Sequence, residues 1–501
     1  MRTRGPLIMT EPARLRFFQC PRSCSLDYGP DCGYHSQVMI IRKEDRILFK
    51  SVLMVALPIM IQNGFTNFVN LLDNIMVGRL GTEPMSGVAI VNEILFVYNL
   101  CIFGGLSGAG IFTAQYFGRG NTEGVRNTFR FKFILGILLT ALAVLIFTVF
   151  GETLIGYYLN ESAEGGDLVA ALAYGRQYLD VMLLGLPGFF LVQSYSSTLR
   201  ECGETVVPMK AGVTAVIVNL VLNYILIYGK LGIPALGVTG AAIATVISRY
   251  VEAGIVIIWT HMHSDRQPFA STLYRTIRVP RRLVSMILSK GMILLLNEAL
   301  WSFGITLVTQ CYSTRGLTAV AGVNIANTLN NLFKVVFLAF GTSVGIIIGR
   351  LLGAGKLDEA KETDRKIMMF SVIISSFVGL LMMSVSWLFP RIYNTTASAR
   401  SLATSLIVAY AVFMPFDAFK NATYFTLRSG GRTFITFLFD GFSEIAINFP
   451  VAFILSRFTS LGVLWIFVGV HLAGLLKLGV GVVLVKRGVW LRNLVDDPEF
   501  G

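Results

Sequence analysis

Eight acidic residues interrupt long apolar stretches of this chain, and their carboxyl groups are the first candidates for chemistry. They are Asp73, Glu93, Asp180, Glu252, Glu298, Asp417, Asp440 and Glu444. A carboxylate inside a membrane is costly unless it faces a wet cavity or a partner, so such residues are functional candidates by default. A carboxyl group of this kind can bind and release a proton, or it can help to bind a cation.

Depth within the apolar stretches ranks these acids. Glu298 and Asp417 each lie near the middle of a stretch, and Asp73 lies in the outer part of the first one. We therefore expect Asp73, Glu298 and Asp417 to form the ion-coupling or substrate site. Glu252 lies three residues from Arg249, a spacing that predicts a structural ion pair on one helical face.

Two further acids and one lysine belong to the same set of candidates. Asp440 and Glu444 are four residues apart on one helical face and are secondary candidates. Lys420 follows Asp417 by three residues, also on one face. This pair could be a static salt bridge that neutralises Asp417, or a switch that opens when a proton, an ion or a substrate arrives.

The sequence leaves two alternatives for the coupling cation, H⁺ and Na⁺. A proton site needs a single acid with a pKa raised by burial, whereas a Na⁺ site needs several oxygen ligands in controlled geometry. Five asparagines in the apolar stretches could supply amide oxygens: Asn63, Asn92, Asn219, Asn223 and Asn327. We expect no cofactor and no metal centre.

Aromatic side chains could form the wall of a substrate cavity. Organic cations are attracted to aromatic faces, and such walls adapt to different shapes. The candidates are Phe65, Tyr98, Trp301 and Phe333. The alternative for each is packing against lipid or within the core, because the chain has 37 Phe.

The elements that must position these residues are transmembrane helices. The chain is 54% apolar and only 14% charged, outside the range of soluble domains. Windows of about 20 apolar residues recur along it, and backbone in lipid must satisfy its own hydrogen bonds. We predict an all-α integral membrane protein with twelve spans, near 47–78, 86–112, 129–151, 173–198, 208–229, 237–260, 285–312, 317–348, 367–389, 403–427, 434–456 and 461–485.

Basic residues fall in alternate connections between these spans. One set of connections holds 26 Lys and Arg, and the opposite set holds 7. The positive-inside rule then places both termini in the cytoplasm of a plasma membrane, the inner membrane if the source is bacterial. The same distribution explains the net charge of +13 without nucleic-acid binding, for which the chain has no motif.

An internal repeat relates the two halves of the chain. A shift of 235 places residues 87–92 on 322–327, and a shift of 228 places 199–205 on 427–433. Each half has six spans and enters from the same side, so the halves are parallel repeats around a natural substrate path. The acids are not repeated, because Asn63 falls opposite Glu298 and Val308 opposite Asp73.

The repeat also sets the expected domains. We expect six-helix bundles at 45–260 and 285–486, a cytoplasmic linker at 261–284 and a cytoplasmic tail at 487–501. Residues 1–44 form a tail without an apolar run, and Met39 is a candidate for the true start. Cys20, Cys24, Cys32 and His35 lie in this tail, but their spacing matches no usual zinc finger.

At this point four segments resemble the multidrug and toxic compound extrusion (MATE) family, in its NorM-like bacterial branch. The first span ends at residues 70–78 with Asp73 before a Met-Val-Gly turn, and residues 219–234 look like the fifth helix of that branch. Glu298 and Asp417 resemble the acids of helices seven and ten. Asn223 stands where some branches of the family carry Asp. The resemblance covers about 45–490.

The resemblance implies V-shaped bundles and an antiporter that exports amphipathic, often cationic compounds in exchange for H⁺ or Na⁺. We expect the protein to be a monomer. A lipid-linked precursor flippase of similar architecture is one alternative, although it should have a cavity rich in Arg and Lys. A channel is another. An enzyme is not expected, because the spans hold no catalytic cluster and the chain has no nucleotide-binding motif.

Overall fold

The computed structural model describes residues 43–161 and 167–496, and every contact below lies within the compact unit that begins at Glu44. These residues form helices and connections, with no strand among them. The interpretations of Met39 and of the cysteines before it concern residues outside the described ranges. Twelve helical segments are long and apolar enough to cross a membrane, which confirms the predicted number of spans and the all-α class.

The first half of the chain contributes six helices, which we call the N-lobe. They are α1 (Lys43–Gly78), α2 (Thr82–Arg119), α3 (Thr122–Glu161), α4 (Leu168–Glu201), α5 (Val206–Tyr228) and α6 (Gly237–Met262). Asp167 caps α4, since its carboxylate accepts from the amides of Val169 and Ala170. Gly229 ends α5 with a left-handed φ of 66°, a conformation that favours glycine.

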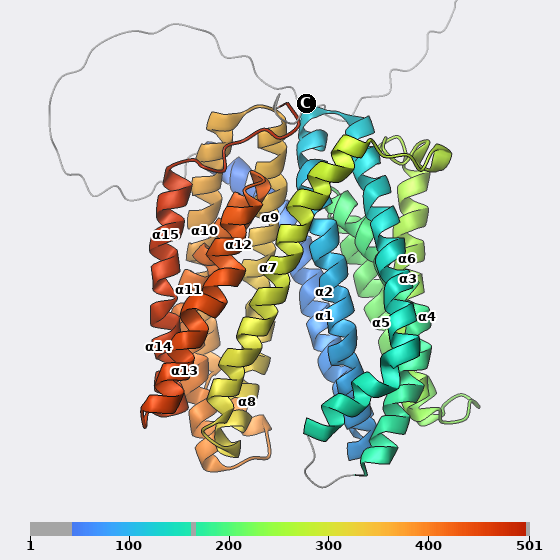
Figure 1. The fold of residues 1–501 in the computed structure, drawn as a ribbon, viewed down its shortest axis with the longest axis vertical. Coiled ribbons are helices and arrows are strands. Elements are labelled where there is room, and N and C mark those ends of the chain that lie inside the picture. The colour runs from blue at the N-terminus through green and yellow to red at the C-terminus, as the bar shows by residue number, and fades with distance from the viewer. Residues whose placement is uncertain (1–42, 162–166, 497–501) are drawn as a thin grey trace, which may run out of the picture. The chain divides into compact units, whose positions relative to one another are not determined.

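The second half, which we call the C-lobe, is more broken. It follows a short turn η1 (Leu273–Arg275) and comprises α7 (Arg281–Ser313), α8 (Leu317–Phe333), α9 (Val335–Gly353), α10 (Leu357–Val385), η2 (Phe389–Ile392), α11 (Ala397–Ser429), α12 (Thr433–Phe437), the π-helical turns η3 (Leu438–Phe442) and η4 (Glu444–Asn448), α13 (Phe449–Phe458), α14 (Val463–Ala473) and α15 (Leu475–Lys486). Figure 1 shows α1–α6 gathered together and α8–α15 gathered beside them.

The span predicted at 317–348 is not one continuous helix. It is interrupted at Lys334, between α8 and α9. The carbonyl of Asn331 accepts a hydrogen bond from the side chain of Asn67 on α1, with 3.1 Å between nitrogen and oxygen. A side chain that enters the helical hydrogen-bond ladder is a known cause of such a break. Because Asn67 is distant in the sequence, the apolar pattern of residues 317–348 could not reveal it.

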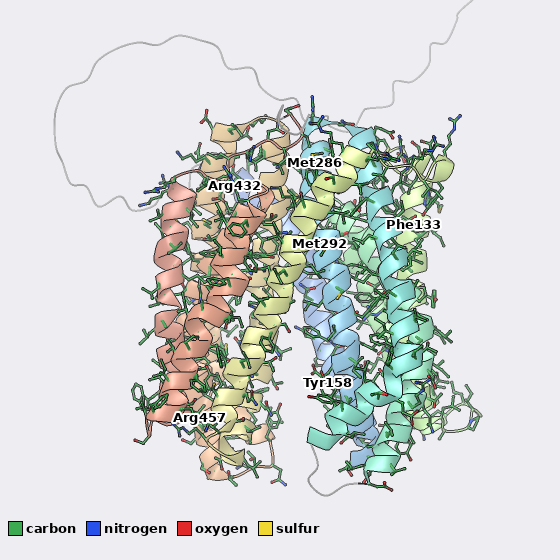
Figure 2. All side chains as sticks on the ribbon, in the orientation of Figure 1. Phe133, Tyr158, Met286, Met292, Arg432 and Arg457 are labelled. Carbon is green, nitrogen blue, oxygen red and sulfur yellow. The ribbon has the colours of Figure 1, made fainter. Side chains whose placement is uncertain are left out.

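The lobes meet along α2, which packs against both α7 and α9. Close approach depends on small residues, because a Cβ on Gly108 would lie 2.5 Å from the Cα of Gly291 on α7. Figure 2 shows that Arg432 and Arg457 lie at opposite ends of the segment 433–458. We call the end near Arg432, where α2, α4, α9 and α11 also end, the basic end.

Hydrogen bonds join the two lobes at the basic end. The buried amide of Gln115 on α2 donates to the carbonyl of Ser429 at 2.9 Å and accepts from the backbone amide of Leu494 at 2.7 Å. In the opposite direction, Arg350 on α9 donates to the carbonyl of Glu201 at 3.0 Å, at the last turn of α4. These bonds hold the lobes together at this end.

Candidate functional site

The N-lobe holds Asp73 among neutral amides. The side-chain nitrogen of Asn223 on α5 donates to Asp73 at 2.7 Å and also lies 3.1 Å from the side-chain oxygen of Asn219. When the Asn219 amide is turned so that its nitrogen faces the acid, that nitrogen lies 3.1 Å from both carboxylate oxygens. The predicted candidates Asp73, Asn219 and Asn223 are therefore brought together by α1 and α5.

A small polar cavity of about 50 Å³ opens beside Asp73. Its lining includes Asn70 and Thr245, whose side-chain oxygens can bind a water molecule or a small cation, and also the positively charged Arg249. Arg249 forms an ion pair with Glu252 at 2.9 Å, so the prediction for that pair is confirmed. The charge on Asp73 itself has no ion-pair partner among the described residues.

The C-lobe holds its acids differently. Glu298 on α7 accepts from the hydroxyl of Tyr424 on α11 at 2.8 Å. Asp440 is paired with Lys477 of α15 at 2.8 Å and also accepts from the amide of Asn297 at 3.2 Å. Glu444 accepts from the side chain of Asn448 at 2.8 Å.

The π-helical turns η3 and η4 carry Asp440 and Glu444, a feature that the sequence did not reveal. The backbone amide of Gly441 donates to the side-chain oxygen of Asn297 at 2.8 Å, so a residue of α7 satisfies a group in the irregular stretch. Pro450 follows within α13 and has no amide to donate. Gly441 and Pro450 in one span were the signal of an irregular helix, and such bulges often mark functional sites.

Asp417 and Lys420 form an ion pair on α11 at 2.7 Å, as their spacing predicts. Both side chains are partly buried, with 26% and 19% of their surface exposed. The pair lies on the same helix as Tyr424 but forms no hydrogen bond or ion pair with Glu298. Its role as a static bridge or a switch stays a prediction.

The remaining asparagine candidates are spread over both lobes. Asn92 accepts from Tyr178 at 3.4 Å, and Asn327, its counterpart in the repeat, accepts from Tyr410 at 2.6 Å. Asn63 lies in the wall of a large cavity between the lobes.

That large cavity has a volume of about 370 Å³ and is lined by both lobes. The N-lobe contributes parts of α1, α2, α4 and α6, and the C-lobe contributes parts of α9 and α11. Most of these parts are the helix halves nearest the basic end. The charged side chains in its wall are Arg200, Glu201, Arg249, Glu252 and Arg428. Arg249 also lines the small cavity beside Asp73, so its side chain borders both spaces.

None of the three main candidate acids lines the large cavity, and neither do the four aromatic candidates. Tyr98 is buried in the N-lobe core with its hydroxyl 2.9 Å from that of Thr140. Phe333 packs against the C-lobe core, Phe65 is 45% exposed, and Trp301 is partly buried. The aromatic residues of the cavity wall are instead Phe103, Phe189 and Phe425. No periodicity in the sequence distinguishes these three from the other phenylalanines.

Comparison with known proteins finds one family. The sequence pattern of the MatE family matches residues 58–225 and 292–454, which is more than half of the chain. The two matched ranges fall in the two lobes.

Individual relatives agree with that match. The probable multidrug resistance protein NorM of Thermotoga maritima is 27% identical over 462 residues, which cover 90% of this chain and 95% of that protein. An outward-facing multidrug resistance MATE family transporter of the MOP superfamily superimposes with a TM-score of 0.78 at 21% identity, covering 89% and 96% of the two chains. A MOP superfamily transporter from Pyrococcus furiosus, whose binding pocket is described as having reverse polarity, gives 0.78 at 22% identity over 89% and 96%.

Proposed function

Because the chain belongs to the MatE family, we propose that it is a secondary active transporter that exports amphipathic, often cationic organic compounds in exchange for H⁺ or Na⁺. The names of its relatives support multidrug export. We further propose that it acts as a monomer in the plasma membrane, with the basic end and both termini in the cytoplasm, and without a cofactor.

The observation that carries this proposal is a large cavity shared by two repeated lobes. Both lobes line the cavity, and hydrogen bonds such as Gln115 to Ser429 hold the lobes together at the basic end. Two parallel repeats that rock against each other around such a space would expose it to one side of the membrane at a time. Opening the basic end requires these bonds to break.

Asp73 is the strongest candidate for the residue that binds the coupling ion. Its carboxylate is surrounded by neutral donors, Asn223 and Asn219, and has room for a cation in the adjoining cavity. A proton or Na⁺ that binds there changes the charge in one lobe, and it shifts the equilibrium between two states if it binds one of them more tightly. Arg249, which lines both cavities, connects this charge to the substrate space.

The alternatives predict different behaviour. A channel would conduct without alternating access, so dye movement through it would not depend on an imposed ion gradient. A flippase for anionic lipid precursors would use basic residues, and the three arginines against two glutamates in the cavity wall are compatible with it. Gradient-driven export of a cationic dye would distinguish the transporter from this alternative.

The test is dye export from proteoliposomes that contain the purified protein. We expect ethidium to be moved against its gradient when a Na⁺ or H⁺ gradient is imposed, and this movement to stop when an ionophore dissipates that gradient. Passive dye flux that is unaffected by either gradient would support a channel and contradict the proposal.

A further inference from the structure

We infer that the large cavity contains a binding subsite for an organic carboxylate, formed by Arg200 of α4 and Arg428 of α11. The inference deepens the proposed function and rests on it, because it names a substrate class for the same cavity. The two arginines would then be specificity-determining residues, which favour those substrates of the cavity that carry a carboxylate.

The repeat brings these two arginines to one place. A shift of 228 aligns Leu199-Arg200 with Leu427-Arg428, so the two side chains occupy equivalent positions at the last turns of α4 and α11. Both helices end at the basic end, and both arginines lie in the wall of the same cavity. The acids differ between the lobes, but this basic residue is duplicated.

Charge balance in the cavity wall leaves these two arginines in excess. Glu201 is paired with the fully buried Lys132 at 2.6 Å, and Glu252 is paired with Arg249 at 2.9 Å. Neither Arg200 nor Arg428 forms an ion pair in the part of the chain that the structure describes. Arg200 instead donates to the neutral side chain of Gln62 at 2.8 Å.

The guanidinium groups also keep unused hydrogen-bond donors. Nη1 of Arg428 and Nε of Arg200 are buried and have no hydrogen-bond partner. A buried donor left without a partner costs free energy. Carboxylates match the planar fork of a guanidinium and accept two parallel hydrogen bonds from it, so a bound carboxylate would satisfy these donors.

Two aromatic rings lie close to the guanidinium group of Arg428 and would also contact the apolar part of a ligand. The guanidinium carbon of Arg428 lies 5.8 Å from the ring centre of Phe103 and 5.4 Å from that of Phe425. Both rings belong to the cavity wall, as does Phe189. A flat aromatic carboxylate could therefore place its charged group on the arginines and its ring system against phenylalanine.

A simpler explanation is that these arginines mark the membrane boundary, as basic residues at helix ends commonly do. In that case they would contact lipid headgroups and have no effect on substrate choice. Their position in a cavity between the lobes argues against it. Arg365 on α10 is exposed and lies outside the cavity wall, so it provides a matched control for the loss of an arginine charge.

The experiment uses a pair of rhodamine dyes with the same ring system, one with a free carboxylate and one with its methyl ester. Export of each dye is measured in proteoliposomes containing the full chain. For Arg428→Gln and Arg200→Gln we expect export of the carboxylate dye to fall about tenfold, the loss expected for a charge-assisted hydrogen bond. Export of the ester should stay within about twofold in both variants, and Arg365→Gln should leave both dyes at the wild-type rate.

The outcomes separate this inference from the proposed function. If the variants export both dyes equally less, or if neither export rate falls, the carboxylate subsite is overturned. Export of the ester by the wild type would then still support the transporter. Failure of the wild-type protein to export either dye would overturn the proposed function. Because a variant could misfold, binding of the carboxylate dye to purified Arg428→Lys is measured as well. We expect weaker binding than in the wild type, since lysine keeps the charge but loses the paired donors; unchanged binding would count against the inference.

Discussion

The two lobes are built from the same repeat, yet they differ in regularity. In the N-lobe, α5 is a continuous helix from Val206 to Tyr228, whereas the equivalent segment 433–458 contains two π-helical turns. In the same way α2 is continuous, while its counterpart is broken at Lys334. Irregular helices have backbone groups that other elements must satisfy, so the C-lobe depends more on contacts between its helices.

The acids of the two lobes differ in their partners. Asp73 in the N-lobe is bound by neutral amides, whereas Asp417 and Asp440 in the C-lobe are each paired with a lysine within 3 Å. A carboxylate whose charge is already neutralised by lysine gains little from a further cation, whereas one held by amides retains its charge. Glu298 of the C-lobe is the exception, because it accepts from the neutral hydroxyl of Tyr424. The comparison teaches that two copies of one scaffold can hold their acids with different partners.

The largest expected effect is the loss of the N-lobe acid. Asp73→Asn keeps the shape of the side chain and removes its charge, so we expect dye export from cells to fall about a hundredfold. Glu298→Gln should also impair export, but less, because Tyr424 can still donate to the amide. Asp180→Asn is the control, since Asp180 is half exposed and paired with Arg176 on the same helix. Normal export in both Asp73→Asn and Glu298→Gln would contradict the site assignment.

A second effect tests the irregular C-lobe. Asn297→Ala removes the acceptor for the amide of Gly441 and a donor to Asp440. We expect a stability loss of about 2 kcal/mol, the cost of buried groups left unpaired, measured as a lower melting temperature of the purified protein. On the regular α5, Thr214→Ala should cost much less, because Thr214 is exposed and bonds only within its own helix. Equal losses of stability in Asn297→Ala and Thr214→Ala would contradict the claim that the C-lobe depends more on contacts between its helices.

The ion pair on α11 is the third test. We expect Asp417→Asn and Lys420→Gln each to lower export about tenfold, since each leaves a partly buried charge without its partner. If the pair is a switch, the double variant will regain thermal stability but not export. Recovery of export in the double variant would show a static bridge instead. Both quantities can be measured on the same three proteins.

The smallest effects compare two tyrosines. Tyr410 donates to Asn327 at 2.6 Å, whereas Tyr178 is 3.4 Å from the equivalent Asn92. Tyr410→Phe should therefore cost about 1 kcal/mol of stability, the value of a normal hydrogen bond, and Tyr178→Phe less than half of that. Thermal unfolding of the two variants tests this order. A larger loss of stability in Tyr178→Phe than in Tyr410→Phe would contradict the prediction.

Much of the scaffold could be predicted from the sequence, because membrane spans, repeats and local ion pairs are encoded by neighbouring residues. The twelve spans and the pair of Arg249 and Glu252 are examples. The break at Lys334 could not be predicted, since it depends on a side chain of α1 that reaches Asn331 from another helix.

The candidate site, like the scaffold, could be predicted only in part from the sequence. Asp73 and Asn223 could be selected one by one as polar residues in apolar spans, but only the fold shows that they meet. The cavity between the lobes lies elsewhere than the three acids, and its phenylalanines have no distinctive spacing. Two arginines of that cavity, Arg200 and Arg428, belong to the repeated segments 199–205 and 427–433, but the sequence alone did not place them in a cavity.

The most direct test of the central claim, that the N-lobe acid couples ion movement to export, is dye export under separately imposed Na⁺ and H⁺ gradients. It is measured in proteoliposomes with the wild-type protein and with Asp73→Asn. We predict that one of the two gradients drives the wild type to concentrate dye, and that Asp73→Asn lets dye equilibrate but never concentrates it under either gradient. Concentration of dye by Asp73→Asn under the same gradient would contradict the account.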